Sequence, residues 1–293
     1  MLTHLRAPSD SLSVLVLGAR GFVARELAGH AASLGWKARA AGSTEINLLH
    51  PQSVDAVAAL LSPNETLIVV SALTPDRSRD ITTLMHNLTM GQHVCAAHEK
   101  QPCAHVINIG SDALYDEAAT PVREVSAVAP ASLHGLMHFT REHMLVDTCR
   151  RLKVPLARLR PSLLYGPGDT HNSYGPNRFV RTALTEGRIA LFGDGKEQRD
   201  HVFIGDVARV VAEVARRRSE GVLNIATGRS HSFRQVADLV ATKVAREVKI
   251  EPSPHANAIV HRHFDVTTQI RAFPAFRFTT LDEGLSCTIA SMS

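Results

Sequence analysis

The 293-residue sequence has few cysteines, few aromatic side chains and no long apolar run. No CxxC pair is present, which favours a reduced, cytoplasmic compartment over a disulfide-stabilised fold; the cysteines are Cys95, Cys103, Cys149 and Cys287. No apolar stretch approaches the roughly 20 residues that a membrane span requires. Residues 1–11 lack the apolar core of a signal peptide. We therefore expect a soluble protein without membrane partners, whose first residues form a loosely ordered leader.

A large excess of positive charge is also missing. Lys and Arg total 32 against 28 Asp and Glu, so the net charge is only +4, and the basic residues are scattered. This pattern does not favour nucleic-acid binding. The one dense cluster, residues 216–218, ends an apolar helical pattern, where cations stabilise the helix dipole. The 16 histidines lie mostly in polar segments, and we expect them on the surface.

Short apolar runs alternate with helical patterns through the first half of the chain. The runs predict strands at 13–17, 36–40, 67–70, 105–109 and 155–159, separated by helices at 21–34, 54–61, 82–97 and 130–152. Continuous apolar strands joined by helices are typical of a parallel sheet covered on both faces. With right-handed crossovers, this order predicts an α/β fold with a doubly wound parallel sheet of the Rossmann type.

The regular alternation of strands and helices ends after Pro161. Turn-rich segments begin at Tyr165, Tyr174 and Phe192, and helices are expected at 179–186, 206–217 and 233–245. These features predict a smaller α/β lobe that closes over the carboxyl edge of the sheet and binds the substrate. We expect a dinucleotide-binding domain at 1–163 and a substrate-binding lobe at 164–293, with segments such as 200–220 returning to the first domain.

The turn between the first strand and the first helix predicts a phosphate site. Gly18 and Gly21 permit a tight turn and a close approach to a pyrophosphate, and Ala24 stands where a third glycine is common. Phe22 and Val23 then begin a helix whose free N–H groups and positive dipole attract an anion. The placement after a buried strand and before a helix supports a dinucleotide site.

The residues after the second strand favour NADP over NAD. An NAD site usually carries a carboxylate at the end of that strand, yet none occurs before Glu45. Arg20 in the turn, with Arg39 or Ser43 nearby, would suit a 2′-phosphate. The expected cofactor-binding residues are Gly18, Arg20, Gly21, Phe22, Val23, Arg39, Ser43, Asn47, Leu48 and Ala72.

Further segments follow in a specific order: 45–49, Asn87, 109–116, 160–168, 199–208 and 224–228. With the glycine turn, they resemble the extended short-chain dehydrogenases/reductases, the NAD-dependent epimerases and dehydratases that modify nucleotide sugars. Within this family, 45–49 resembles the adenine-contacting segment of the GDP-fucose synthase branch. The resemblance implies that Ser111 hydrogen-bonds the reacting oxygen and that a Tyr-x-x-x-Lys motif begins the long helix.

The sequence departs from the family at that motif, because His134 stands at the tyrosine position and His138 at the lysine position. Glu142 supports this register. Three interpretations remain open. His134 acts as acid/base while His138 hydrogen-bonds a ribose; the protein binds nucleotides with little redox chemistry, with Tyr115 or Asp112 as substitutes; or the two imidazoles and Glu142 hold zinc. We predict catalytic Ser111, His134 and His138 without a metal.

The predicted substrate is a nucleotide sugar, modified by an epimerase, reductase or dehydratase reaction. Arg199 resembles the family's diphosphate-binding arginine, and Asn177, Asp112 and Tyr115 complete the expected substrate set. Alternatively, Arg199 pairs with a nearby carboxylate such as Asp200 or Asp206. Asp206 is expected to cap a helix. The family also implies a homodimer formed by the helices at 82–97 and 134–152.

Overall fold

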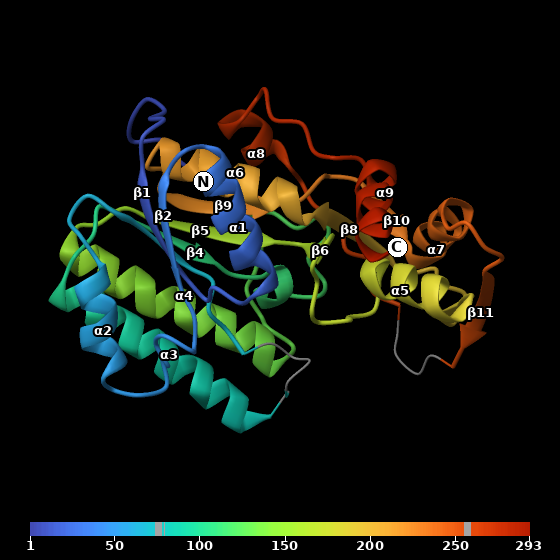
Figure 1. The fold of residues 1–293 in the computed structure, drawn as a ribbon, viewed down its shortest axis with the longest axis horizontal. Coiled ribbons are helices and arrows are strands. Elements are labelled where there is room, and N and C mark those ends of the chain that lie inside the picture. Colours follow the sequence, from blue (N-terminus) through green and yellow to red (C-terminus); the bar gives the residue numbers. More distant parts are fainter. Residues whose placement is uncertain (74–77, 79, 255–258) are drawn as a thin grey trace.

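A computed structural model describes residues 1–73, 78, 80–254 and 259–293. In these residues, six parallel strands form a central sheet in the order β2-β1-β3-β4-β5-β9 (Figure 1). The strands are β1 (Ser13–Leu17), β2 (Lys37–Ala41), β3 (Thr66–Val69), β4 (His105–Ile109), β5 (Leu156–Pro161) and β9 (Gly221–Ile225). The strand order reverses between β1 and β3, and ligands of such sheets bind at the carboxyl ends beside this reversal. The predicted fold class is confirmed.

Helices cover both faces of the parallel sheet. One face packs against α1 (Phe22–Ser33) and α6 (Ile204–Arg216), and the other against α2 (Ser53–Leu60), α3 (Ile81–Lys100) and α4 (Leu133–Leu152). The inner strands β1, β3 and β4 are accordingly almost fully buried and mainly apolar, as expected for strands covered on both sides, whereas the edge strand β2 is largely exposed. The helix expected from residue 130 begins at Leu133 because Ser132 caps it by accepting from the Gly135 N–H at 3.1 Å.

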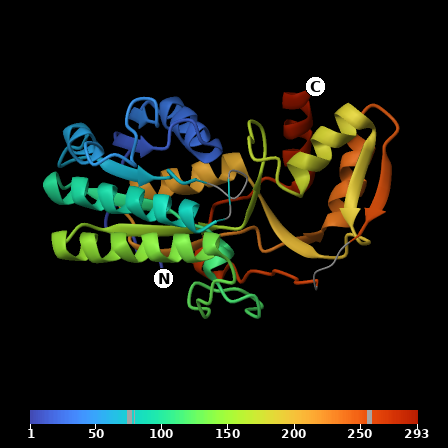
Figure 2. The same cartoon turned by 90° about the horizontal axis from the view of Figure 1, so that it is seen from below.

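A smaller lobe lies beyond the carboxyl ends of the strands (Figure 2). It contains a three-stranded sheet of β6 (Leu163–Tyr165), β8 (Gln198–Phe203) and β10 (Ser230–Ser232), and a parallel pair, β7 (Arg188–Phe192) and β11 (Lys249–Ser253). Around a separate apolar core pack α5 (Pro176–Glu186), α7 (Phe233–Lys243) and α9 (Leu281–Met292). The short helix α8 (Thr267–Ala272) returns to β9. Chain after residue 163 thus contributes to both the lobe and the main sheet.

The first residues are anchored to the end of α6, so the expectation of a loosely ordered leader is wrong. Thr3 and Glu220 exchange backbone hydrogen bonds of 2.8 and 2.9 Å, and the amides of Leu5 and Arg6 donate to the carbonyl of Arg217. The carbonyls at the end of a helix lack partners within the helix, which makes them acceptors for a neighbouring segment. The Arg216 and Arg217 side chains pair with Glu213, as expected of cations in a last turn.

The expectation that most histidines lie on the surface has three exceptions among the described residues, and the expectation for Asp206 is wrong. His98, His105 and His201 are buried, and desolvation lowers the pKa of His105 to about 4. Asp206 does not cap α6: it lies inside the first turn, where its carboxylate accepts from the Thr279 amide at 2.7 Å. Both differences arise because polar residues in these segments are covered by chain that is distant in sequence. Of the helices described, none is long and apolar enough to cross a membrane.

Candidate active site

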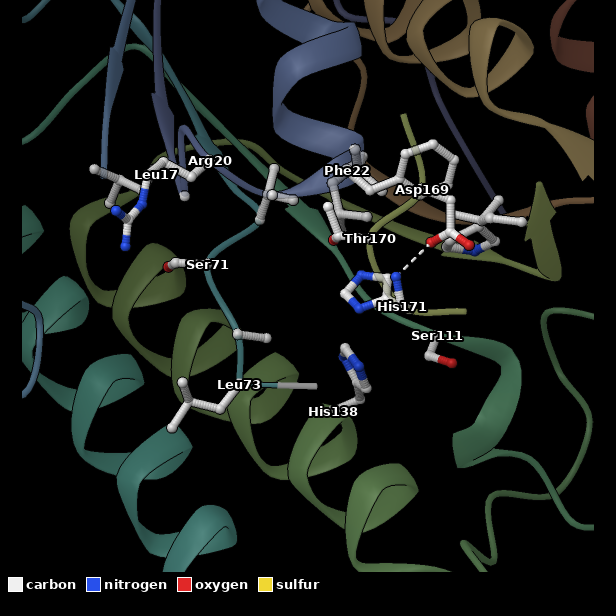
Figure 3. Close-up of a pocket in the computed structure, with 18 of the residues that line it drawn as sticks. Leu17, Arg20, Phe22, Ser71, Leu73, Ser111, His138, Asp169, Thr170 and His171 are labelled. Carbon is white, nitrogen blue, oxygen red and sulfur yellow. Dashed lines mark hydrogen bonds between the residues drawn. The ribbon is translucent and has the colours of Figure 1, made fainter. Parts of the chain in front are cut away.

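A cleft of about 600 Å³ opens at the carboxyl ends of β1, β3, β4 and β5, where the strand order reverses (Figure 3). Its walls come from the β1–α1 turn, the end of β2, the β3–α3 segment, the start of α4 and a loop of the lobe. The cleft brings together twelve of the residues singled out in the sequence: Gly18, Arg20, Gly21, Phe22, Val23, Ser43, Asn47, Leu48, Ala72, Ser111, His134 and His138. Asn177 also lines it.

The β1–α1 turn is suited to a phosphate group. Glycine at residues 18 and 21 lets its backbone pack closely against neighbouring chain, and the start of α1 then meets the cleft. Gly18 has φ +111°, and a Cβ there would lie 2.9 Å from the backbone nitrogen of Ser71, which follows β3. Gly21 precedes α1 in an extended conformation, and a Cβ there would lie 3.2 Å from the Gly18 carbonyl oxygen. The first turn of α1 carries no acidic residue. Free N–H groups at the start of α1 therefore meet the cleft without a competing carboxylate.

The β1–α1 turn contributes a cation to the cleft, next to the residues that follow β2. Arg20 Nη2 donates to Ser43 Oγ at 3.1 Å, and both side chains are exposed at the rim. Glu45, the nearby carboxylate, is turned back on the chain, where Oε2 accepts from the Gly42 amide at 2.9 Å. Arg39 does not reach the cleft, because it forms an ion pair of 2.8 Å with the buried Glu65.

The segment after β3 is positioned by a buried asparagine. Asn87 Oδ1 accepts from the Leu73 amide at 2.8 Å, and its Nδ2 donates to the Leu73 carbonyl at 3.0 Å. This pair of bonds fixes the backbone that carries Ala72 into the cleft. Asn87 therefore has a structural role at the edge of the cleft.

Ser111 follows β4 and is held close to α4. Its Oγ accepts from the Ala113 amide at 3.2 Å, which begins the short helix η1 (Asp112–Leu114). A Cβ at Gly135 would lie only 2.2 Å from the Ala113 carbonyl oxygen. Glycine at this position lets the first turn of α4 approach the residues after Ser111 closely.

The two histidines of α4 share one side of the helix. The ring centroids of His134 and His138 are 4.6 Å apart with planes at 88°, as expected for positions i and i+4. Burial lowers the pKa of His138 well below its ordinary value of 6.5, and the neighbouring His134 and Arg141 lower it further. His138 is thus a neutral hydrogen-bonding group at neutral pH, whereas a lysine there would carry a positive charge.

Glu142 belongs to a buried network away from the cleft. Its Oε2 accepts from Arg160 Nε at 3.0 Å, and Arg160 Nη1 donates to the Tyr115 hydroxyl at 2.7 Å. That hydroxyl donates to Asn224 Oδ1 at 2.7 Å. The Glu142 carboxylate is therefore paired with arginine and does not form a metal site with the two imidazoles. Among the described residues, no group of three or more potential metal ligands is arranged to hold an ion.

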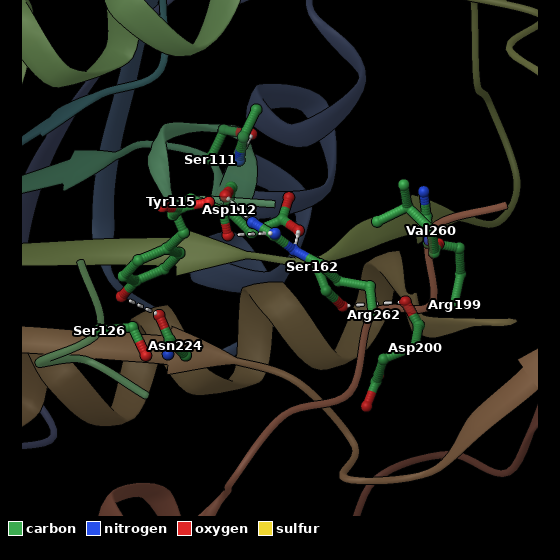
Figure 4. Close-up of polar contacts among 12 residues, drawn as sticks. Ser111, Asp112, Tyr115, Ser126, Ser162, Arg199, Asp200, Asn224, Val260 and Arg262 are labelled. Carbon is green, nitrogen blue, oxygen red and sulfur yellow. Dashed lines mark hydrogen bonds and ion pairs between the residues drawn. The ribbon is translucent and has the colours of Figure 1, made fainter. Parts of the chain in front are cut away.

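Three of the expected substrate residues lie outside the cleft lining (Figure 4). Tyr115 is buried in the network just described. The Asp112 carboxylate lies 3.3 Å from Arg262 Nε, and Arg262 also donates to the Asp112 carbonyl at 2.6 Å. Arg199 pairs with Glu197 and donates to the Val260 carbonyl. This agrees with the alternative that Arg199 meets a carboxylate, although the partner is neither Asp200 nor Asp206.

Asn177 and Asp200 organise the lobe side. Asn177 is buried and binds both the amide and the carbonyl of Gly166 at 2.9 Å. Asp200 accepts from the amides of Thr227 and Gly228 at 2.9 and 2.8 Å, and burial raises its pKa to about 6. Both side chains fix loops that follow strands.

The loop that closes the lobe side of the cleft was not predicted from the sequence. Asp169, Thr170, His171, Ser173 and Tyr174 all line it. Their composition is typical of a surface turn, so only their position after Gly166-Pro167-Gly168, in a segment already matched to the family, could have indicated the site.

Comparisons with known proteins agree with this architecture. The model of the NAD dependent epimerase/dehydratase family matches residues 14–226. The dTDP-L-rhamnose 4-epimerase of Burkholderia thailandensis is 32% identical over 133 residues, which cover 44% of this chain and 35% of that protein. The chain spans about half or less of the length of the first curated relatives that it matches.

Solved structures support the same fold at lower identity. A UDP-glucose 4-epimerase with UDP-glucose from Thermotoga maritima has a TM-score of 0.85 and 20% identity, covering 96% of this chain and 98% of that chain. A UDP-glucose 4-epimerase in complex with NAD from Thermus thermophilus has a TM-score of 0.84 and 19% identity, with the same coverage of 96% and 98%. With the family match over more than half of its residues, this chain belongs to the NAD dependent epimerase/dehydratase family.

Proposed function

We propose that the protein is a nucleotide-sugar epimerase, reductase or dehydratase in which an imidazole takes the place of the usual phenol. The observation that carries this proposal is the shared cleft, which joins the Gly18 turn to Ser111 and His134. A dinucleotide that starts at a phosphate turn and extends along such a cleft would present its other end to these side chains.

The residues of the cleft fit a nicotinamide dinucleotide. Gly18 and Gly21 line the cleft at the start of α1, so a pyrophosphate there would lie against the backbone of the turn and the free N–H groups of the helix. We infer a preference for NADP over NAD, because Arg20 and Ser43 offer donors at the rim and Glu45 is occupied by the Gly42 amide. When bound, the cofactor would supply a hydride acceptor or donor for a carbon of the sugar.

The side chains of the chain would then handle the proton. Ser111 Oγ hydrogen-bonds the sugar oxygen and stabilises charge that develops on it. One ring nitrogen of His134 accepts the hydroxyl proton when the carbon is oxidised and returns it on reduction, since imidazole transfers protons near neutral pH. His138, which is neutral, orients a ribose hydroxyl or the ring of His134 rather than contributing a positive charge.

The nucleotide part of the substrate is proposed to bind on the lobe side, where Asn177 orders the end of the cleft. Arg199 remains a candidate for the diphosphate. To bind it, the guanidinium would have to exchange its ion pair with Glu197 for phosphate oxygens.

We also infer a homodimer through α3 and α4, in a cytoplasmic setting. Ile81, Met85 and Leu136 on these helices are exposed apolar side chains, whereas Leu145 and Met144 pack toward the core. The dimer would bury the exposed set, and sedimentation equilibrium with Met85→Glu would test it: the dimer dissociates if this face forms it.

The proposed function is tested with purified protein, NADP or NAD, and a panel of sugar nucleotides. Absorbance of reduced nicotinamide and mass spectrometry of the sugar are followed together. Turnover that is lost in His134→Ala but retained in the exposed control His86→Ala supports the proposal. Turnover that is unchanged in His134→Ala contradicts it.

A second function is favoured by one observation, the neutral state of His138. Without a positive charge at this position, a protein on this scaffold would bind a dinucleotide and sugar nucleotide with little redox chemistry. Saturable binding of both ligands without any turnover across the panel would support this alternative over the enzyme.

A further inference from the structure

The loop between β6 and α5 supplies a third imidazole to the cleft. His171 lies in this loop and lines the same cleft as Ser111, His134 and His138. The loop belongs to the lobe side, whereas the other two histidines belong to α4. The cleft therefore carries imidazoles on two of its walls.

Contacts from both sides hold the loop in place. Arg25 on α1 donates from Nη2 to the Gly168 carbonyl at 2.5 Å, and Arg181 on α5 donates to the Asp169 carbonyl at 3.3 Å. The Asp169 carboxylate accepts from the His171 backbone amide at 2.9 Å. These bonds anchor the backbone of His171 to the helices of both parts of the molecule, so that its side chain enters the cleft from a defined position.

His171 lies on the loop side of the cleft and His138 on the α4 side, and both line the same cleft as Ser111 (Figure 3). A substrate whose oxygen binds Ser111 would therefore occupy a cleft with imidazoles on two different walls. In a reaction that moves a proton only on the reacting oxygen, His134 is sufficient. A second base, on the opposite wall, is needed only when another atom of the substrate also loses and regains a proton.

We propose that His171 is a second proton-transfer residue, which removes and returns the proton on the carbon next to the oxidised carbon of the sugar. This inference rests on the proposed function. The C–H beside a ketone is acidic enough for an imidazole to remove its proton. The C–H electron pair forms an enolate whose oxygen accepts from Ser111, and the imidazolium returns the proton to the carbon, so no other reactant is consumed.

The consequence concerns the substrate class. The substrate would be a ketosugar nucleotide that enolises, as required by dehydration or by epimerisation beside the carbonyl. An epimerase that inverts only the carbon it oxidises has no need of this proton transfer. His171 would therefore place the enzyme among those that change a carbon other than the oxidised one.

The test uses a preformed nucleoside diphosphate 4-ketohexose in D₂O, so that exchange does not depend on oxidation by the enzyme. Mass spectrometry and NMR follow deuterium at the carbon beside the ketone. We expect the wild type to catalyse this exchange, and His171→Ala to lose it by about 100-fold or more, the usual contribution of a general base. His86→Ala, which removes an exposed histidine of α3, should exchange like the wild type.

A merely structural role is distinguished by adding free imidazole to His171→Ala. Recovery of exchange supports proton transfer, since a small base in solution does not repair a displaced loop. Exchange that is absent in the wild type with bound ketosugar, unaffected by His171→Ala, or not restored by imidazole overturns the inference. Failure of the proposed function is seen separately, as no binding of the ketosugar and no reduction of nicotinamide by any sugar nucleotide.

Discussion

The β1–α1 turn and the first turn of α4 face the same cleft, yet they depend on different parts of the chain. The turn at Gly18 and Gly21 acts through its backbone, which any side chain would obstruct. The start of α4 meets the cleft through the side chains of His134 and His138. Backbone geometry thus restricts which residues can occupy the glycine turn, whereas the side chains that α4 presents to the cleft can vary while other residues fix the position of the helix.

The residues that fix α4 are separate from the two histidines. Ser132 caps the helix, Gly135 fits against the Ala113 carbonyl, and Glu142 binds Arg160. None of these contacts depends on the identity of residues 134 and 138. The position of α4 therefore does not depend on which residues stand at 134 and 138.

The largest effect on stability is expected from removing one of the contacts that hold α4 in place. Glu142→Leu leaves Arg160 buried without its carboxylate and should lower the free energy of unfolding by about 3–5 kcal/mol. The control Asp147→Ala removes an exposed ion pair on the same helix and should cost no more than about 1 kcal/mol. Urea denaturation measures both. Equal stability of the two variants would mean that the buried network does not anchor α4.

Gly18→Ala tests whether the backbone of the β1–α1 turn forms the phosphate site. The methyl group meets a φ of +111° and the Ser71 nitrogen, so NADPH binding should weaken by about 100-fold, or about 2.7 kcal/mol. Gly29→Ala in α1 meets no atom within 4 Å and should raise stability by about 0.5–1 kcal/mol without changing the affinity. Fluorescence titration with NADPH gives the dissociation constants. An unchanged value for Gly18→Ala would exclude the turn as the phosphate site.

Arg20→Ala tests the cation of the same turn, at the rim of the cleft. A charged hydrogen bond to the 2′-phosphate should contribute about 1.5–3 kcal/mol, so NADP should bind roughly 10- to 100-fold more weakly. The affinity for NAD, which lacks that phosphate, should change by less than about 2-fold. Arg39→Ala serves as the matched control, since Arg39 binds Glu65 outside the cleft. Equal losses for the two cofactors would contradict the NADP preference.

His138→Lys returns a positive charge to α4. If the cofactor ribose lies beside this position, the charged donor should tighten NADPH binding by roughly 10-fold. Lys at the exposed position 143 of the same helix, in His143→Lys, should have little effect. Titrations of both variants at one ionic strength separate a local contact from general attraction. A tighter complex in His143→Lys alone would place the ribose elsewhere.

The smallest effect concerns the pH dependence of stability. Burial lowers the pKa of His138 in the folded protein below its ordinary 6.5, so the neutral ring is favoured on folding. The stability that this provides is complete above about pH 6.5 and is lost as the pH falls toward the lowered pKa. His138→Gln should therefore show a shallower fall in unfolding free energy between pH 7 and pH 5, measured by urea denaturation. An identical fall in the two proteins would contradict a lowered pKa.

The sequence predicted the parallel sheet because its inner strands are buried on both faces and are thus mainly apolar. The sequence also predicted the glycine turn, because the backbone geometry there favours glycine at residues 18 and 21. Asp112, Tyr115 and Arg199 were assigned to the substrate, but their partners are Arg262, Arg160 and Glu197. Pairing of polar groups depends on chain that is distant in sequence, which no local pattern reveals.

The same limit explains the loop residue His171 and the buried histidines. The loop sequence resembles a surface turn, and only the approach of the lobe to the sheet brings it into the cleft. His105 becomes buried because the chain around Ser219 covers it, with a contact of 2.8 Å to the Ser219 carbonyl. Local periodicity indicates which segments form elements, whereas the contacts between elements decide the environment of each polar side chain.

The central claim is that a dinucleotide bound at the Gly18 turn directs its nicotinamide end toward His134 and His138. The most direct measurement is the response of the imidazole NMR signals of these two residues, assigned with the single variants, to two ligands. NADP should shift both signals, and adenosine 2′,5′-bisphosphate, which lacks the nicotinamide half, should bind and leave them unchanged. Saturation with NADP that moves neither signal would contradict the account.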